Sequence, residues 1–112
     1  MNYVFVATHV NLANRTHKEA AMELEAKVLI VDDDDLVISI IKNILKRDNY
    51  ISDYCHSGEE ALKMVQENSY ELVLLDVNMG SGLDGYETCK LMHKTQPDLP
   101  VILVTASRMM NL

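Results

Sequence analysis

The sequence predicts an α/β fold: a doubly wound parallel sheet with helices on both faces. Continuous apolar runs alternate with stretches in which apolar residues recur every three or four positions, the pattern of buried strands alternating with amphipathic helices. The chain has 112 residues, enough for one domain with one core. Right-handed crossovers between successive strands would place helices on both faces of the sheet.

The elements follow in chain order from residue 27. The run KVLIV (27–31) is apolar throughout and rich in β-branched residues, which is typical of a strand covered on both faces. Apolar residues from Leu36 to Leu45 recur at helical spacing, so a helix is expected there, ending at Asp48. The remaining predicted elements are a strand at 50–54, a helix capped by Ser57 with Glu60 and running to about 68, a strand at 71–75, a helix capped by Asp84 with Glu87 and running to 94, and a strand at 101–104.

Residues 1–26 do not follow this alternation. We expect them to be a loosely attached N-terminal extension, with 27–112 as the folded domain. In an alternative interpretation, the segment YVFVA (3–7) pairs beside the strand at 101–104 and residues 15–26 form a helix. That helix would run into residue 27 with almost no loop, which weighs against the alternative.

Composition excludes several classes of protein. The net charge of −7 argues against a nucleic-acid surface, which needs a basic stripe, and suits a site that holds a cation. No apolar run is long enough to span a bilayer, and the first residues lack the basic region of a signal peptide, so we expect a cytoplasmic protein. Cys55 and Cys89 lack metal-type spacing and are expected to be reduced.

Polar side chains follow three of the predicted strands. Asp32 and Asp33 come after the first strand, Asp76 after the strand at 71–75, and Thr105 after the last strand. Ligands of an open parallel sheet bind beyond the carboxyl ends of its strands. Carboxylates crowded there repel unless a cation joins them, and Mg²⁺ takes a few carboxylates while keeping several waters. The sequence therefore predicts a Mg²⁺ site, with one of the adjacent aspartates binding directly and the other through water.

The other aspartates of the run have a simpler role. Asp34 and Asp35 lie at the start of a helix, where an anionic cap offsets the helix dipole. A solvated capping loop is the alternative for the whole run, but it does not explain Asp76 and Thr105. An aspartate directly after a buried strand can act as a nucleophile toward a phosphoryl group. The Thr105 hydroxyl could donate to a phosphoryl oxygen, or simply bond to the backbone.

Four stretches together carry a resemblance to a known family. In their order and spacing, VLIVDDDD, ELVLLDVNM, LDGYE and PVILVTAS resemble the receiver (CheY-like) domain of two-component response regulators. The resemblance covers residues 27–112, about four of the family's five βα units. It implies a flavodoxin-like fold with strand order 2-1-3-4-5 and a phosphoacceptor signalling module. Such a module is not an enzyme beyond catalysing its own phosphorylation and dephosphorylation.

The resemblance also implies roles for particular residues. Asp76 resembles the phosphoacceptor and Thr105 the switch hydroxyl beside it. Asp32, Asp33, Asp76 and the backbone carbonyl of Asn78 correspond to the Mg²⁺ ligands, with Asp33 the direct ligand of the acidic pair. The implied phosphodonor is a phosphohistidine of a sensor histidine kinase or a phosphotransfer protein. Binding to nucleic acid or membrane is not expected of this chain.

The sequence departs from the family pattern in two places. Gly80 stands where the family usually has proline, and the loop to Asp84 is one residue longer, which should loosen the turn. The fifth strand, its lysine, the aromatic switch residue and the last helix are not found before Leu112, so we expect a truncated receiver. The strand at 101–104 would then be an exposed sheet edge, open to dimerisation.

Two further functional interpretations stay open. Without the family's lysine, the chain could be a pseudo-receiver or remnant that acts as an interaction domain and accepts no phosphate. The spacing of Asp33, Asp35 and Val37 after an apolar strand also resembles the motifs of haloacid-dehalogenase-type phosphatases, with Asp33 as nucleophile. That resemblance leaves Asp76 unexplained.

Overall fold

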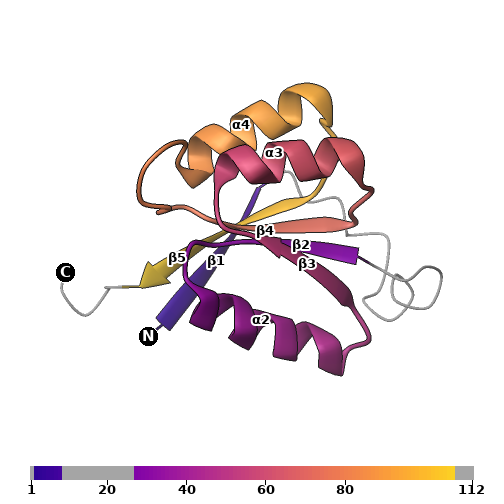
Figure 1. The fold of residues 1–112 in the computed structure, drawn as a ribbon, viewed down its shortest axis with the longest axis vertical. Coiled ribbons are helices and arrows are strands. Elements are labelled where there is room, and N and C mark those ends of the chain that lie inside the picture. The colour runs from indigo at the N-terminus through magenta and orange to yellow at the C-terminus, as the bar shows by residue number, and fades with distance from the viewer. Residues whose placement is uncertain (1, 9–26, 108–112) are drawn as a thin grey trace.

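The computed structural model describes residues 2–8 and 27–107, which form one five-stranded sheet and three helices (Figure 1). The strands lie in the order β1-β5-β4-β2-β3. The strands are β1 (Asn2–Thr8), β2 (Lys27–Val31), β3 (Ile51–Cys55), β4 (Leu72–Asp76) and β5 (Val101–Ser107), and the helices are α2 (Asp35–Arg47), α3 (Gly58–Glu67) and α4 (Gly85–Thr95).

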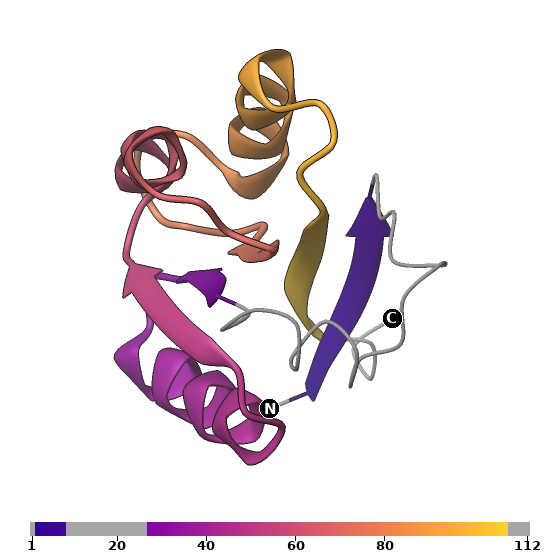
Figure 2. The same cartoon turned by 90° about the vertical axis from the view of Figure 1, so that its right-hand side faces the viewer.

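The helices form two layers around the sheet. Helix α2 covers one face, and α3 and α4 cover the other (Figures 1 and 2). Strands β2 to β5 are parallel, and their order β3-β2-β4-β5 corresponds to 2-1-3-4 of a flavodoxin-like sheet. The predicted doubly wound α/β fold is therefore confirmed.

The continuous apolar run of β2 is explained by burial on both sides of the sheet. Leu29 and Val31 belong to the apolar cluster beneath α3 and α4, whereas Val28 and Ile30 belong to the cluster beneath α2. Successive side chains of a strand point to opposite faces, so each face receives two of the four. Full burial of such a side chain stabilises the fold by about 1.5–3 kcal/mol.

Short polar side chains begin each helix. Asp34 caps α2 by accepting from the Leu36 backbone N–H at 2.9 Å. Asp84 and Glu87 form the predicted reciprocal capping box of α4. Ser57 caps α3 by accepting a backbone N–H of its first turn. These caps satisfy N–H groups that have no partner within the helix.

The N-terminal segment differs from the main expectation. Residues 2–8 are not a loosely attached extension in this structure, because β1 pairs antiparallel with β5 from Asn2↔Ser107 to Thr8↔Val101. This is the strand of the alternative interpretation; the helix predicted at 15–26 lies outside the described residues. Pairing with β1 satisfies backbone groups that β5 would otherwise leave open. In Figure 2, β1 runs alongside β5 at the edge of the sheet.

Strand β5 is longer than the predicted 101–104, and its edge is covered. Its parallel ladder with β4 ends where Val104 meets Asp76, but β1 continues the pairing to Ser107. Thr105 therefore lies within a strand and not after it. The proposed route to dimerisation through an exposed β5 edge does not hold in this structure, because β1 occupies that edge. Among the described strands, the sheet edges are β1 and β3.

Candidate functional site

Three carboxylates meet at the carboxyl edge of the sheet. Asp32, Asp33 and Asp76, here called the acidic cluster, each offer an oxygen within 4.8 Å of the others. Asp32 directly follows β2 and Asp76 ends β4, and these neighbouring parallel strands end at the same edge. Asp32 and Asp76 are buried, whereas Asp33 is exposed. The structure thus brings together the three aspartates singled out from the sequence.

Backbone groups fix the buried carboxylates. Oδ1 of Asp32 accepts from the Asp34 N–H at 2.9 Å, and Oδ1 of Asp76 accepts from the Asn78 N–H at 3.3 Å. The Asp32 N–H donates to the Cys55 carbonyl at 3.1 Å, which ties the segment after β2 to the end of β3. Each bond occupies one lone pair of a carboxylate, which has about four acceptor positions. Both carboxylates therefore keep capacity for another ligand.

The cluster is electrostatically strained. Burial raises the pKa of Asp32 to about 6; the Asp34 N–H opposes this shift, and the neighbouring carboxylates of Asp76, Asp33 and Asp34 add to it. Burial also raises the pKa of Asp76, opposed by the N–H of Asn78 and assisted by the charge of Asp33. Both shifts mean that the folded chain disfavours the charged form of these groups.

No side-chain cation of the described residues neutralises this charge. The ion pairs found within ranges 2–8 and 27–107 join Lys27 to Asp53 at 3.0 Å and His56 to Asp35 at 2.6 Å, and neither includes the acidic cluster. A set of carboxylate oxygens suits a hard cation such as Mg²⁺, which prefers oxygen to sulfur. The residues present therefore fit a Mg²⁺ ion.

Asn78 and Thr105 flank the cluster along the chain. Asn78 is exposed and lies two residues past Asp76, to which its N–H is bonded. Thr105 is half-buried and follows Val104, the β5 partner of Asp76. The Val77 N–H donates to the Val104 carbonyl at 3.0 Å, so the segment after β4 stays beside β5 at this point. Both predicted residues thus lie along the chain next to the carboxyl edge of the sheet.

The loop between β4 and α4 contains the departure from the family pattern. Gly80 and Gly82 have positive φ angles of 58° and 87°, which glycine adopts without strain. A Cβ built on Gly80 would lie 3.4 Å from Oδ2 of Asp33, so this turn lies against the acidic cluster. At the end of the loop, a Cβ on Gly85 would lie 2.3 Å from the Asp76 carbonyl oxygen, and a larger residue would not fit.

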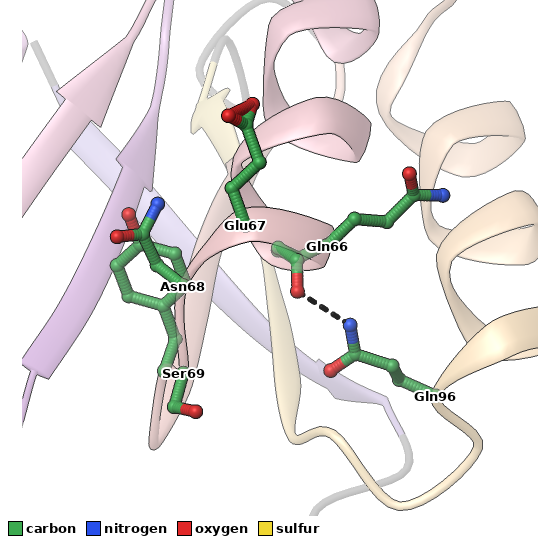
Figure 3. A pocket seen from close by; sticks show the side chains of 7 residues that line it. Gln66, Glu67, Asn68, Ser69 and Gln96 are labelled. Atoms are coloured by element: carbon green, nitrogen blue, oxygen red, sulfur yellow. Dashed lines mark hydrogen bonds between the residues drawn. The ribbon is translucent and has the colours of Figure 1, made fainter.

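A separate pocket lies between the last turns of α3 and α4 (Figure 3). Its volume is about 390 Å³, and Gln96 crosses it to donate to the Val65 carbonyl at 2.6 Å. Glu67 is the one charged residue in its lining. The pocket adjoins the start of β4, at the opposite edge of the sheet from the acidic cluster. It is lined by Val65, Gln66, Glu67, Asn68, Ser69, Tyr70 and Gln96. The acidic cluster is therefore the stronger candidate for chemistry.

Comparison with known proteins agrees with this arrangement. Residues 28–112 match the family described as the response regulator receiver domain. The chain is 40% identical over 83 residues to the transcriptional regulatory protein YvrH of Bacillus subtilis, covering 72% of this chain and 34% of that protein. It is 37% identical over 82 residues to ResD of the same organism, covering 73% and 33%. The chain thus spans about a third of the length of these relatives.

A solved structure shows the same likeness. The response regulator TrrA from Thermotoga maritima, in complex with Mg²⁺-BeF, is 34% identical with a TM-score of 0.71, covering 75% of this chain and 72% of that one. A parallel sheet with an acidic cluster at its carboxyl edge agrees with a receiver-type domain. This chain belongs to the response regulator receiver domain family, the regulatory modules of two-component signalling and phosphorelays.

Both cysteines, Cys55 and Cys89, are buried in the fold. Both are free, and burial raises the pKa of the Cys55 thiol to about 12. Cys89 is buried at the α4 side of the core. No helix in the described ranges is long and apolar enough to cross a membrane.

Sequence reasoning missed one side chain beside the site. Glu59, in the first turn of α3, accepts from the Leu83 N–H at 3.2 Å with its Oε2. The two residues are 24 positions apart, and no local pattern in the sequence indicates the contact. The close approach of Gly85 to Asp76 had a weak signal in the sequence. Glycine is a poor helix former, so a glycine at the first position of a helix, where no positive φ is needed, indicates that a side chain would not fit there.

Proposed function

We propose that this domain accepts a phosphoryl group on Asp76 from the phosphohistidine of a sensor histidine kinase or phosphotransfer protein, with Mg²⁺ bound at the acidic cluster. The observation that carries the proposal is the meeting of three carboxylates with no neutralising cation among the described side chains. Membership of the receiver family supplies the class of reaction, and the related TrrA structure with Mg²⁺-BeF supports the choice of metal.

The chain's own groups would have distinct tasks. Asp32, Asp33, Asp76 and the Asn78 carbonyl would hold the ion. Bound Mg²⁺ would neutralise charge on the carboxylates and on the phosphoryl oxygens. One oxygen of Asp76 would attack phosphorus, the P–N bond would break, and the departing imidazole nitrogen would take its electron pair. The Thr105 hydroxyl would then donate to an oxygen of the new aspartyl phosphate.

The proposal limits what else this domain does. It would act as a regulatory module in the cytoplasm and catalyse only its own phosphorylation and dephosphorylation. We expect no direct contact with nucleic acid or membrane by the described residues, since the chain is strongly acidic and the site binds a cation.

Phosphorylation with a small donor tests the assignment. The protein is incubated with acetyl phosphate and Mg²⁺, and covalent phosphate is measured by intact mass. Asp76→Asn should abolish labelling, whereas Asp33→Asn should keep it and raise the Mg²⁺ concentration required by roughly tenfold or more. Labelling that persists in Asp76→Asn would contradict the assignment. Repeated turnover of phosphate esters that is lost in Asp33→Asn would instead indicate a phosphatase of the haloacid dehalogenase type.

A second candidate is an interaction domain that accepts no phosphate. The observation that favours it is that two lysines of the described residues are engaged elsewhere. Lys27 pairs with Asp53 and Lys42 lies over the ring of Tyr54, so neither is available to a phosphoryl group at the acidic cluster. A chain that neither binds Mg²⁺ at millimolar concentration nor gains labile phosphate would belong to this second class.

A further inference from the structure

The loop from Gly80 to Leu83 raises a physical question. It is one residue longer than the family pattern and has two residues with positive φ, so its backbone has much conformational freedom to lose. It nevertheless lies against the acidic cluster, because a Cβ added at Gly80 would lie 3.4 Å from Oδ2 of Asp33. If this loop were mobile, the groups around the ion would adopt many arrangements. The contacts that hold the loop therefore matter for ion binding.

Glu59 holds the helix-side end of this loop from a different element. The side chain extends from the first turn of α3, and its Oε2 accepts from the Leu83 N–H at 3.2 Å. Gly82 faces the same carboxylate, since a Cβ built there would lie 2.9 Å from Oε2 and 3.2 Å from Oε1. A side chain at position 82 would displace the carboxylate. The glycine and the glutamate are therefore complementary.

The residues that directly follow Leu83 are fixed by other bonds. Asp84 is bound in the capping box of α4, and Gly85 donates its N–H to the Val77 carbonyl at 3.0 Å. Between Leu83 and the acidic cluster, however, Gly80 and Gly82 provide no side chain that could anchor the chain. On the cluster side this stretch is held by the buried Met79 side chain and by the bond from the Asn78 N–H to Asp76, and on the helix side by the bond from the Leu83 N–H to Glu59.

We propose that Glu59 is a positioning residue for the metal and phosphoryl site. It touches neither group and acts through the loop, holding Leu83 and Gly82 so that Gly80 stays beside Asp33 before the ion arrives. Ordering a loop in advance removes part of the entropy that binding would otherwise cost. This role rests on the proposed function of the acidic cluster.

Three variants separate the hydrogen bond from the charge. Glu59→Ala removes both, Glu59→Gln keeps an oxygen that can accept from the Leu83 N–H, and Glu67→Ala removes an equal charge from the exposed far end of the same helix. Mg²⁺ affinity is measured by calorimetry, and exchange of the Leu83 amide proton is measured by NMR in the absence of metal. Circular dichroism and thermal unfolding verify that each variant is folded.

We expect Glu59→Ala to weaken Mg²⁺ binding by roughly two- to tenfold, the effect of one hydrogen bond, and to speed exchange at Leu83. Glu59→Gln should restore most of both properties, and Glu67→Ala should leave both unchanged. Glu59→Gln binding Mg²⁺ as weakly as Glu59→Ala would overturn the proposal, because charge alone would then explain the effect. Unchanged affinity and exchange in Glu59→Ala would overturn it as well.

The outcomes also separate this proposal from the proposed function. If the wild-type domain binds Mg²⁺ but Asp76 is never labelled, the phosphoacceptor assignment fails while the variants still decide the role of Glu59. If the wild-type domain binds no Mg²⁺, both the metal site and the positioning role are refuted. The exchange measurement then still shows whether Glu59 holds the loop, since it requires neither metal nor phosphate.

Discussion

Two carboxylate sites in this domain, Asp53 and the acidic cluster, have opposite environments. On β3, Asp53 accepts from Lys27 Nζ at 3.0 Å and from the Tyr70 hydroxyl at 2.7 Å. Burial opposes ionisation of Asp53, but these two bonds and the lysine charge outweigh it and lower its pKa. In the acidic cluster, burial and neighbouring carboxylates raise the pKa of Asp32 to about 6, in spite of the N–H of Asp34.

The comparison teaches where each site obtains its compensating charge. Lys27 also lies 5.5 Å from the centre of the Tyr70 ring, so the Asp53 site is neutralised by groups of the protein itself. The acidic cluster has no such partner among the described residues. A carboxylate site completed by the chain stabilises the fold, whereas one left incomplete can use its excess charge to bind a cation.

The largest expected effect separates the two sites by metal affinity. Asp32→Asn should weaken Mg²⁺ binding by roughly tenfold or more, because it removes one of the charges that attract the ion. Asp53→Asn should leave the affinity unchanged, since Asp53 already has cationic and hydroxyl partners. Isothermal titration of both variants provides the measurement. Equal losses would mean that the net charge of the domain, and not the acidic cluster, sets the affinity.

The next effect concerns stability without metal. Asp32 has a pKa of about 6 in the folded state, against an ordinary value of 3.8, so the folded state binds its proton more tightly than the unfolded chain does. Its contribution to stability is complete below pH 3.8 and is lost as the pH rises through about 6. The free energy of unfolding in EDTA should therefore fall between pH 4 and pH 6.5, on the order of 2 kcal/mol.

Urea unfolding at the two pH values measures this loss, and Asp32→Asn is the control. That variant should show a flatter pH dependence and greater stability at pH 7 than the metal-free parent. Saturating Mg²⁺ should reverse the loss in the parent, because the ion binds only the folded state. A metal-free parent that is equally stable at both pH values would show that the cluster carries no electrostatic strain.

The smallest effect is expected at Asp53, with the opposite sign. Asp53→Asn should destabilise the domain by about 1 kcal/mol at pH 7, since it weakens the bonds to Lys27 and Tyr70. Because its folded pKa is lowered, the contribution of Asp53 is present above pH 3.8 and is lost as the pH falls through the folded value. Urea unfolding at pH 7 tests this, and a stabilised variant would remove the contrast between the sites.

Local patterns were sufficient to predict the order of elements and the acidic cluster. Strand and helix periods differ, and parallel strands end at one edge, so Asp32, Asp33 and Asp76 could be placed together without coordinates. Most boundaries moved by about one residue, since Asp76 is the last residue of β4 and not the one after it, whereas β5 runs three residues further than predicted. The periodic signal weakens at strand ends, where burial changes gradually.

Features that depend on distant partners could not be predicted. The antiparallel direction of β1 depends on pairing with a strand about a hundred residues away, and it lengthens β5 to Ser107. The bond between Tyr70 and Asp53 spans 17 residues and that between Leu83 and Glu59 spans 24. Each of these contacts depends on how helices, strands and loops pack against one another, and the residue spacing within one element does not specify that packing.

The contact between Gly85 and Asp76 has a mechanical consequence. With 2.3 Å between the Asp76 carbonyl oxygen and the place where a Cβ at position 85 would lie, the first residue of α4 rests on the main chain of Asp76. A side chain larger than glycine at position 85 would therefore push the start of α4 away from β4. Tyr86, the next residue and 64% exposed, is where such a movement would reach the outer surface.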